Sequence, residues 1–167
     1  MSNVPFHLKH HHVGYFVSNI DTTVKWYEEM FGFELAHKTV YDLPGQGPTQ
    51  MCWIQNGNFW IELYQYDPAL APFTVEDYLG KLGCKHVCFY VANDEFDALR
   101  NHLKEKGANV FVDIRWPNDQ SGALVEPMAA DSDKDISTGV IYVADPDGMW
   151  IEVQGEFYPG VGAKKEQ

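Results

Sequence analysis

The sequence repeats itself once, and this repeat constrains the fold more than any other feature. The segment HVGYFVSN at residues 12–19 aligns with HVCFYVAN at residues 86–93. Alternate residues of a strand point to opposite faces, so one face of each copy combines a histidine with two other residues: His12, Gly14 and Phe16 in the first copy and His86, Cys88 and Tyr90 in the second. Two copies of one pattern predict two equivalent modules.

Each of these strands leads into a predicted helix. The first helix has Asp21 as a plausible N-cap and ends at Gly32, and the second ends at Gly107. Apolar residues recur at helical spacing in both, at Ile20, Val24, Tyr27 and Phe31 in the first and at Phe96, Leu99 and Leu103 in the second. The two terminal glycines lie 75 residues apart and the two histidines 74, so the repeat keeps its register through the helix.

Three extended segments follow each helix. Residues 33–41, 50–55 and 59–65 correspond to residues 109–116, 139–144 and 149–154, and turns at 56–58 and 145–148 join the last two segments of each copy. The predicted fold is therefore α+β, with two tandem βαβββ modules that form a curled mixed sheet with the helices outside. We expect a single domain over residues 1–167.

The predicted boundaries follow from the repeat. Module one covers about 8–67 and module two about 84–156, with a linker helix capped by Thr74 at about 73–83 and a frayed tail at 157–167. The second copy contains an additional polar, acidic loop at 117–139, for which a solvated loop and a lid over a site are both open.

Composition restricts the partners of the chain. The formal net charge is −12, and Arg100 and Arg115 are the only arginines, so neither nucleic acid nor an anionic membrane is an expected partner. No apolar run reaches the length of a membrane span, and the N-terminal residues lack the apolar core of a signal peptide. Three cysteines suit a reducing compartment, and we expect a cytoplasmic protein.

The last strand of each copy carries a glutamate among apolar residues. Glu62 in FWIELYQ and Glu152 in MWIEVQ occupy equivalent positions, on the strand face opposite the aliphatic residues that should cover the helix. If each sheet curls with its helix outside, the two glutamates converge with His12 and His86 on the inner face. Neighbouring buried carboxylates repel each other, whereas imidazole and carboxylate together suit a divalent metal such as Ni, Co, Fe, Mn or Zn.

Simpler interpretations of these residues stay open. A single histidine on a strand is usually structural and a single strand glutamate is usually solvated, so the four positions could also be a metal-free remnant of a site. His10 and His11 fall outside the register of the repeat and are expected on the surface. The segment CKHVC resembles a zinc motif, but residues two apart on a strand are too widely spaced for tetrahedral thiolates.

The chain resembles members of the vicinal oxygen chelate superfamily, which includes glyoxalase I, methylmalonyl-CoA epimerase, extradiol dioxygenases and fosfomycin-resistance proteins. The resemblance covers about residues 8–156 and is carried by four motifs, HHVGYFVSNIDTTVKWYEEMFGFEL, WIELYQ, KHVCFYVAN and DPDGMWIEVQ. It implies that His12, Glu62, His86 and Glu152 are the metal ligands, that the cofactor is one divalent ion and that the protein is a homodimer. The ligand set is similar to that of bacterial glyoxalase I, whereas methylmalonyl-CoA epimerases carry glutamine in place of Glu62.

The predicted function is that of a metal-dependent lyase or isomerase of the glyoxalase I or epimerase type. It would move a proton through a metal-bound enediolate on a small substrate with vicinal oxygens, with Glu152 or Glu62 as the base. Aromatic residues expected on the inner face suggest an apolar or ring-containing substrate: Phe16, Trp60, Tyr64, Tyr90 and Trp150. The alternatives are an Fe(II) extradiol-type ring-cleaving dioxygenase and a non-catalytic small-molecule binding or resistance protein.

Overall fold

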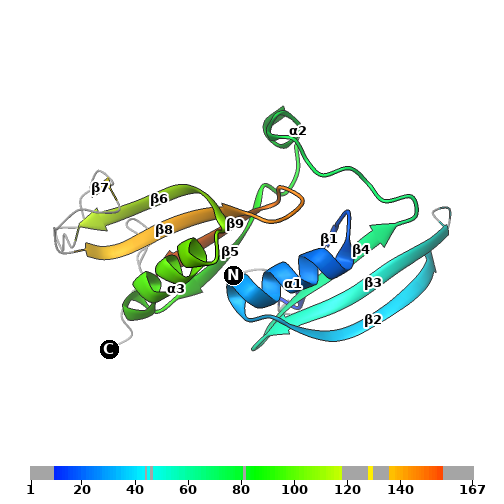
Figure 1. The fold of residues 1–167 in the computed structure, drawn as a ribbon, viewed down its shortest axis with the longest axis horizontal. Helices are drawn as coiled ribbons and strands as arrows, with labels where there is room; N and C mark the ends of the chain where they lie inside the picture. The colour runs from blue at the N-terminus through cyan, green and yellow to red at the C-terminus, as the bar shows by residue number, and fades with distance from the viewer. Residues whose placement is uncertain are drawn as a thin grey trace, which may run out of the picture. The chain divides into compact units, whose positions relative to one another are not determined.

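The first module is a four-stranded mixed sheet with one helix packed on it (Figure 1). The computed structural model describes residues 10–43, 45, 47–80, 82–117, 128–129 and 136–155. The elements follow the order β1 (His12–Phe16), α1 (Ile20–Phe31), β2 (Glu34–Leu43), β3 (Gly47–Asn56) and β4 (Phe59–Tyr66). In the sheet the order is β1-β4-β3-β2, with β1 parallel to β4 and the other neighbours antiparallel.

The second module repeats this arrangement after a short linker helix, α2 (Val75–Gly80). Its elements are β5 (His86–Val91), α3 (Asn93–Glu105), β6 (Asn109–Pro117), β7 (Met128–Ala129), β8 (Ile136–Ala144) and β9 (Trp150–Gly155). The sheet order is β5-β9-β8-β6-β7, and β5 is parallel to β9 as β1 is to β4. The predicted α+β class with two βαβββ modules is therefore confirmed, and the short strand β7 is an addition.

The chain divides into two compact units, Met1–Pro72 and Phe73–Gln167. Two predictions concern segments outside the described residues: most of the acidic loop at 117–139, with its possible lid role, and the tail at 157–167. None of the helices in the described part of the chain has the length and apolar character that a membrane crossing requires.

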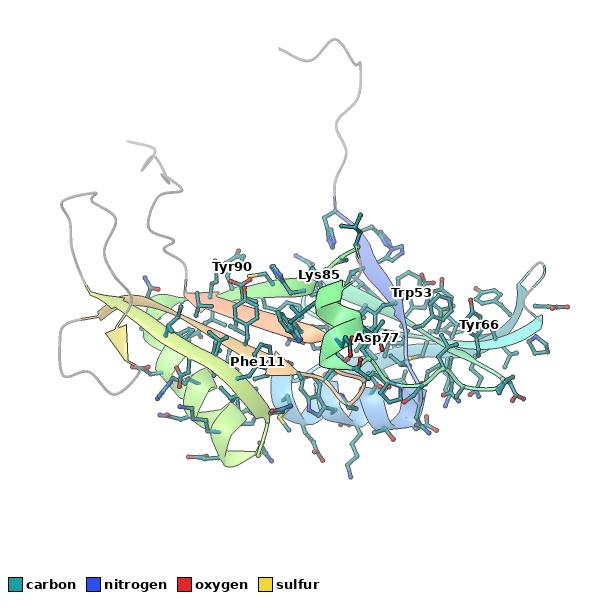
Figure 2. The ribbon with its side chains drawn as sticks, turned by 90° about the horizontal axis from the view of Figure 1, so that it is seen from above. Trp53, Tyr66, Asp77, Lys85, Tyr90 and Phe111 are labelled. Atoms are coloured by element: carbon teal, nitrogen blue, oxygen red, sulfur yellow. The ribbon has the colours of Figure 1, made fainter. Side chains whose placement is uncertain are left out.

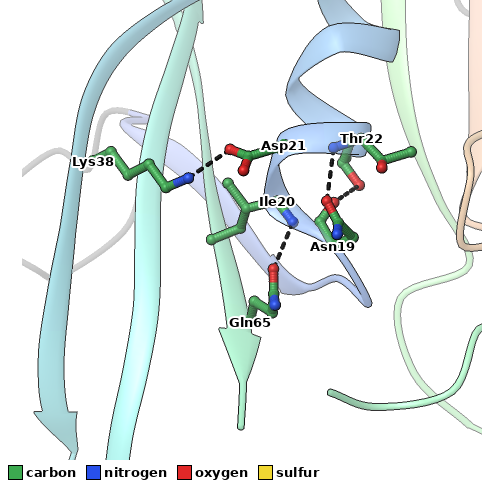
Figure 3. Close-up of polar contacts among 7 residues, drawn as sticks. Asn19, Ile20, Asp21, Thr22, Lys38 and Gln65 are labelled. Atoms are coloured by element: carbon green, nitrogen blue, oxygen red, sulfur yellow. Dashed lines mark hydrogen bonds and ion pairs between the residues drawn. The ribbon is translucent and has the colours of Figure 1, made fainter. Parts of the chain in front are cut away.

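The start of α1 differs from the prediction. The N-cap is Asn19, whose side-chain oxygen accepts a hydrogen bond from Thr22 N at 2.9 Å (Figure 3), so the assignment of Asp21 as the cap was wrong. Asp21 lies in the first turn instead and pairs with Lys38 of β2 at 2.5 Å, while Ile20 N donates to the Gln65 side chain at 2.8 Å. These contacts join the first turn of α1 to the middle of β2 and to the end of β4.

The end of α1 and the start of α2 follow the sequence pattern. Gly32 closes α1 in the left-handed conformation at φ 65°, which costs glycine no steric strain, as predicted. Thr74 Oγ1 accepts from Asp77 N at 3.0 Å and caps α2, which is shorter than the predicted linker helix.

The cores lie between each helix and the aliphatic face of its sheet. The buried side chains of α1 are Ile20, Thr23, Tyr27 and Met30, so the buried stripe is rotated slightly from the predicted one. In the second unit Phe96 of α3 packs directly over Gly139 of β8, where a Cβ atom would come within 2.4 Å of the Phe96 ring. Ile61 and Leu63 of β4, like Ile151 and Val153 of β9, are fully buried. The glutamate between each pair of aliphatic residues is thereby directed to the opposite face.

Candidate metal-binding site

A histidine and a glutamate meet on neighbouring parallel strands of the first unit. His12 of β1 pairs in register with Trp60 of β4, and Gly14 pairs with Glu62, so the two side chains project from the same face of the sheet. His12 Nε2 lies 3.4 Å from Glu62 Oε2, and the side chains are 36% and 12% exposed respectively. The Glu62 carboxylate lies over Gly14, where an added Cβ would be 3.5 Å from Oε2.

The second unit contains the same pair at the equivalent strands. His86 Nε2 of β5 lies 3.0 Å from Glu152 Oε2 of β9, and Glu152 is buried while the imidazole keeps 41% of its surface exposed. Here Cys88 occupies the register position opposite Glu152 that Gly14 holds opposite Glu62. A buried carboxylate whose ion-pair partner is an imidazole is costly unless a proton or a cation neutralises it.

An aromatic residue stands directly opposite each glutamate on the next antiparallel strand. Trp53 of β3 pairs with Glu62, and Tyr142 of β8 pairs with Glu152. Each aromatic ring also meets the histidine of its unit edge to face, with ring centroids 4.7 Å apart for Trp53 and His12 and 5.7 Å apart for Tyr142 and His86. The ring therefore supports the imidazole from one side.

Sequence reasoning missed Trp53 and Tyr142. They lie 89 residues apart, whereas the two glutamates lie 90 apart, because the hairpin before Glu152 is one residue longer than the hairpin before Glu62. A search at one fixed offset cannot align residues on both sides of hairpins that differ in length. Counting back from each turn, as antiparallel pairing requires, would have found the two aromatics.

Each glutamate has a further polar partner two residues later on its own strand. Gln154 Nε2 donates to Glu152 Oε1 at 2.6 Å. Tyr64 holds the equivalent position in β4, and burial of its hydroxyl, followed by the hydrogen bond to Glu62 and the charge of Glu62, raises its pKa to about 12. Tyr64 is therefore a neutral hydrogen-bond donor at physiological pH.

The Cys88 thiol is also adjacent to Glu152. Burial, then the negative charge of Glu152 and a hydrogen bond to it, raises the pKa of Cys88 to about 12. The residue is thus a protonated thiol in this environment rather than a reactive thiolate. The other cysteine of the CKHVC segment, Cys84, contacts the backbone oxygen of His86 at 3.4 Å.

Of the five aromatic residues predicted to line the substrate site, three lie among other rings of the first unit, one lies among rings of the second unit, and one is largely exposed. In the first unit Phe16 lies 5.4 Å from Tyr64 and stacks on Tyr66 at 4.4 Å, and Trp60 lies 6.1 Å from Trp53. In the second unit the Trp150 ring lies 4.9 Å from Phe111 and 6.4 Å from Tyr142. Tyr90 is 76% exposed on β5 (Figure 2, where Trp53, Tyr66 and Phe111 are also labelled).

His10 and His11 contact aromatic side chains of the first unit, although neither keeps the register of the repeat. His10 and His11 are both exposed, as expected. However, the Nδ1 atom of His11 lies 2.8 Å from Nδ1 of His12, and His10 stacks on Phe59 at 5.4 Å. His11 therefore contacts the ring nitrogen of His12 that faces away from Glu62.

The donor chemistry of the two pairs fits a divalent metal. In each unit one imidazole nitrogen lies within 3.4 Å of one carboxylate oxygen. Imidazole nitrogen and carboxylate oxygen are ligand types that borderline first-row metals prefer. Over the part of the chain that the structure describes, no group of three or more His, Cys, Asp or Glu side chains gathers at one point. Each unit thus holds one pair of candidate donors.

The family model described as Glyoxalase/Bleomycin resistance protein/Dioxygenase superfamily matches residues 9–153. No curated protein matches the chain, whereas many solved structures do.

Three of these structures illustrate which kinds of protein are similar to this chain. A glyoxalase family protein from Enterococcus faecalis is 22% identical, with a TM-score of 0.59, over 87% of this chain and 96% of its own. The fosfomycin resistance protein FosX from Listeria monocytogenes, solved with Mn(II) and sulfate, is 12% identical, with a TM-score of 0.59, over 91% and 95%. The trypanothione-dependent glyoxalase I of Leishmania major is 17% identical, with a TM-score of 0.58, over 90% and 88%. At these identities the likeness concerns the fold.

Proposed function

The chain belongs to the Glyoxalase/Bleomycin resistance protein/Dioxygenase superfamily, and from this premise we propose that it is a metal-dependent lyase or isomerase. Its substrate would be a small molecule with two adjacent oxygens, on which the enzyme moves a proton between neighbouring positions. Its reaction type would be that of glyoxalase I or of an epimerase.

The observation that carries this proposal is the recurrence of one His–Glu pair in both units. His12 with Glu62 and His86 with Glu152 occupy equivalent parallel strands, although most of the surrounding residues differ between the two copies. We propose these four side chains as the ligands of one divalent ion, Ni, Co, Mn, Zn or Fe. The Mn(II) in the FosX structure supports a metal in this fold. A bound ion would polarise a substrate carbonyl and stabilise the negative charge that develops there.

The protein's own contribution is a carboxylate base held in place. Glu152 or Glu62 would take the proton from the carbon beside the carbonyl and return it to the adjacent carbon or to the opposite face. A positioned general base of this kind typically accelerates proton transfer by about 10²- to 10⁴-fold. The imidazole beside each carboxylate and the aromatic ring behind that imidazole restrict its motion.

The surroundings of the pairs favour an apolar or ring-containing substrate over a highly anionic one. Aromatic rings lie beside both pairs, and the chain has few cationic groups to bind several phosphates or carboxylates. Arg100, one of the two arginines, is already engaged with Asp113 at 2.8 Å and keeps only 15% of its side chain exposed. We therefore propose a substrate other than a glutathione conjugate or a CoA ester.

The test is proton exchange followed by NMR in D₂O. Metal-loaded protein is incubated with a panel of 2-hydroxycarbonyl compounds and thioesters, and deuterium incorporation at the carbon beside the carbonyl is measured. The expected result is incorporation by the wild type that falls at least about 10²-fold in Glu62→Gln or Glu152→Gln. Glu28→Gln, an exposed change on α1, serves as the matched control and should exchange at the wild-type rate. Undiminished exchange by both site variants would reject the mechanism.

A second function, Fe(II)-dependent ring cleavage, is favoured by the aromatic rings beside the histidines. Extradiol-type chemistry would use a catechol, whose flat ring can stack on such side chains. Oxygen consumption with catechols that depends on added Fe(II), together with no proton exchange, would select this function in place of the first.

A further inference from the structure

Both oxygens of the Glu152 carboxylate are engaged, and by different partners. Oε2 faces His86 Nε2 at 3.0 Å, and Oε1 accepts the hydrogen bond from Gln154 Nε2 at 2.6 Å. An ionised carboxylate can only accept hydrogen bonds, so the amide nitrogen of Gln154, and not its oxygen, must face Glu152. Because the Glu152 carboxylate is buried, bulk water cannot readily supply a hydrogen bond in place of the one from Gln154.

The first unit has a different residue at the equivalent position. Tyr64 lies two residues after Glu62, as Gln154 lies two after Glu152, and its phenol hydroxyl, like the Gln154 amide nitrogen, is a neutral hydrogen-bond donor. A Cβ atom at Gly14 would lie 3.5 Å from Glu62 Oε2 and 3.7 Å from Tyr64 Cε2, so the carboxylate and the ring lie together over Gly14. An amide and a phenol thus occupy equivalent positions in the two units, and both are neutral hydrogen-bond donors.

Strand geometry explains why the donor is two residues away. Residues i and i+2 project from the same face, about 6–7 Å apart along the strand, so a side chain of moderate length reaches back to the carboxylate. A donor on the same strand as the glutamate would keep its position relative to the carboxylate when substrate binds. It therefore restricts rotation of the carboxylate without occupying the space in front of it.

We propose that Gln154 and Tyr64 are positioning residues, which hold one oxygen of Glu152 and of Glu62 so that a single oxygen of each faces the metal and the substrate. This inference rests on the proposed function, because it assumes that the two glutamates are ligands. It adds the reason why each glutamate would bind through one oxygen and keep a fixed direction while it exchanges a proton. Partners of this kind typically change metal affinity by about 10- to 100-fold.

The test uses Co(II) as the probe, on full-length protein stripped of metal. Gln154→Leu and Tyr64→Phe each remove the donor and keep most of the side-chain volume. Gln50→Leu and Tyr41→Phe are matched controls on strands β3 and β2 of the first unit. Co(II) affinity is measured by competition titration, and the visible absorption spectrum of the Co(II) protein reports the number and type of donor atoms.

We expect each site variant to bind Co(II) about 10- to 100-fold more weakly than the wild type and to show a changed absorption spectrum, while both controls match the wild type. Affinities within twofold of the wild type, with unchanged spectra, would overturn the inference, as would an unchanged spectrum accompanied only by a lower melting temperature. If Gln154→Leu does not fold, Gln154→Asn and Tyr64→Phe decide by the same readouts. A wild type that binds no Co(II) would overturn both this inference and the proposed function, whereas normal wild-type binding with unaffected variants overturns this inference alone.

Discussion

Gly139→Ala should destabilise the second unit because the buried ring of Phe96 occupies the space that a side chain at position 139 needs. An added Cβ would lie 2.4 Å from Phe96 Cε1 and 2.7 Å from Cζ, well inside van der Waals contact. Phe96 is only 4% exposed and cannot swing into solvent, so the helix or the ring must shift within the core. Forced overpacking of this kind costs about 1–3 kcal/mol.

The expected cost corresponds to a lower melting temperature. For a chain of this length the conversion is about 3 °C per kcal/mol, so Gly139→Ala should melt about 3–9 °C below the wild type by circular dichroism. Gly80→Ala is the control, because a Cβ at Gly80 would meet nothing within 4 Å, and its stability should stay within about 0.5 kcal/mol of the wild type.

A double-mutant cycle separates this clash from a general loss of strand flexibility. Phe96→Leu removes the ring atoms that approach Gly139, so adding Gly139→Ala to that variant should cost less than adding it to the wild type. Urea unfolding of the four proteins gives the interaction energy. Equal costs in both backgrounds, or a Gly139→Ala protein as stable as the wild type, would refute the packing argument.

Two further predictions concern acidic groups outside the candidate site. Burial raises the pKa of Asp113, but the hydrogen bonds and charges of Arg100 and Lys104 outweigh it, so its pKa lies below the ordinary 3.8. Asp113→Asn should therefore cost about 1.5–3 kcal/mol at pH 7 in urea unfolding, and the difference should shrink as the pH falls below 3.8 through the folded pKa; an equal cost at both pH values would contradict this. Burial raises the pKa of Asp145 to about 7, despite hydrogen bonds from backbone amides such as Met149 N at 2.8 Å. Its contribution to stability should decline as the pH rises from 3.8 to about 7, and Asp145→Asn should remove this decline in melts at pH 5 and pH 8.

Most of the fold was predictable because the pattern of each helix and strand occurs twice in the sequence. The alternation of β1 and β5, the glycine stop of α1 and the apolar last strands agree between the copies, so each module supports the interpretation of the other. The cap of α1 was not predicted, because Asn19 and Asp21 are both good cap residues and only the backbone angles of Asn19 decide between them.

Within the candidate site, the sequence identified the residues that recur at a fixed offset and missed those that recur by strand pairing. The His–Glu pairs were found because the parallel strand pairs at one edge of each sheet, β1 with β4 and β5 with β9, keep the repeat register. Trp53 and Tyr142 were missed because hairpin length shifts them by one residue. The role proposed for Tyr64 and Gln154 could not be predicted from residue type, since a phenol and an amide have no obvious likeness until each is found two residues after a glutamate of the candidate site.

The most direct measurement of the central claim is the metal content of untagged protein purified without chelator, determined by mass spectrometry. The account predicts about one Ni, Co, Mn or Zn per chain in the wild type, and a large loss of metal when His12 or His86 is replaced by alanine. His102→Ala, on helix α3, is the histidine control and should retain the metal. A wild type that contains no metal and takes none up on reconstitution, or His12 and His86 variants that keep a full complement, would contradict the account.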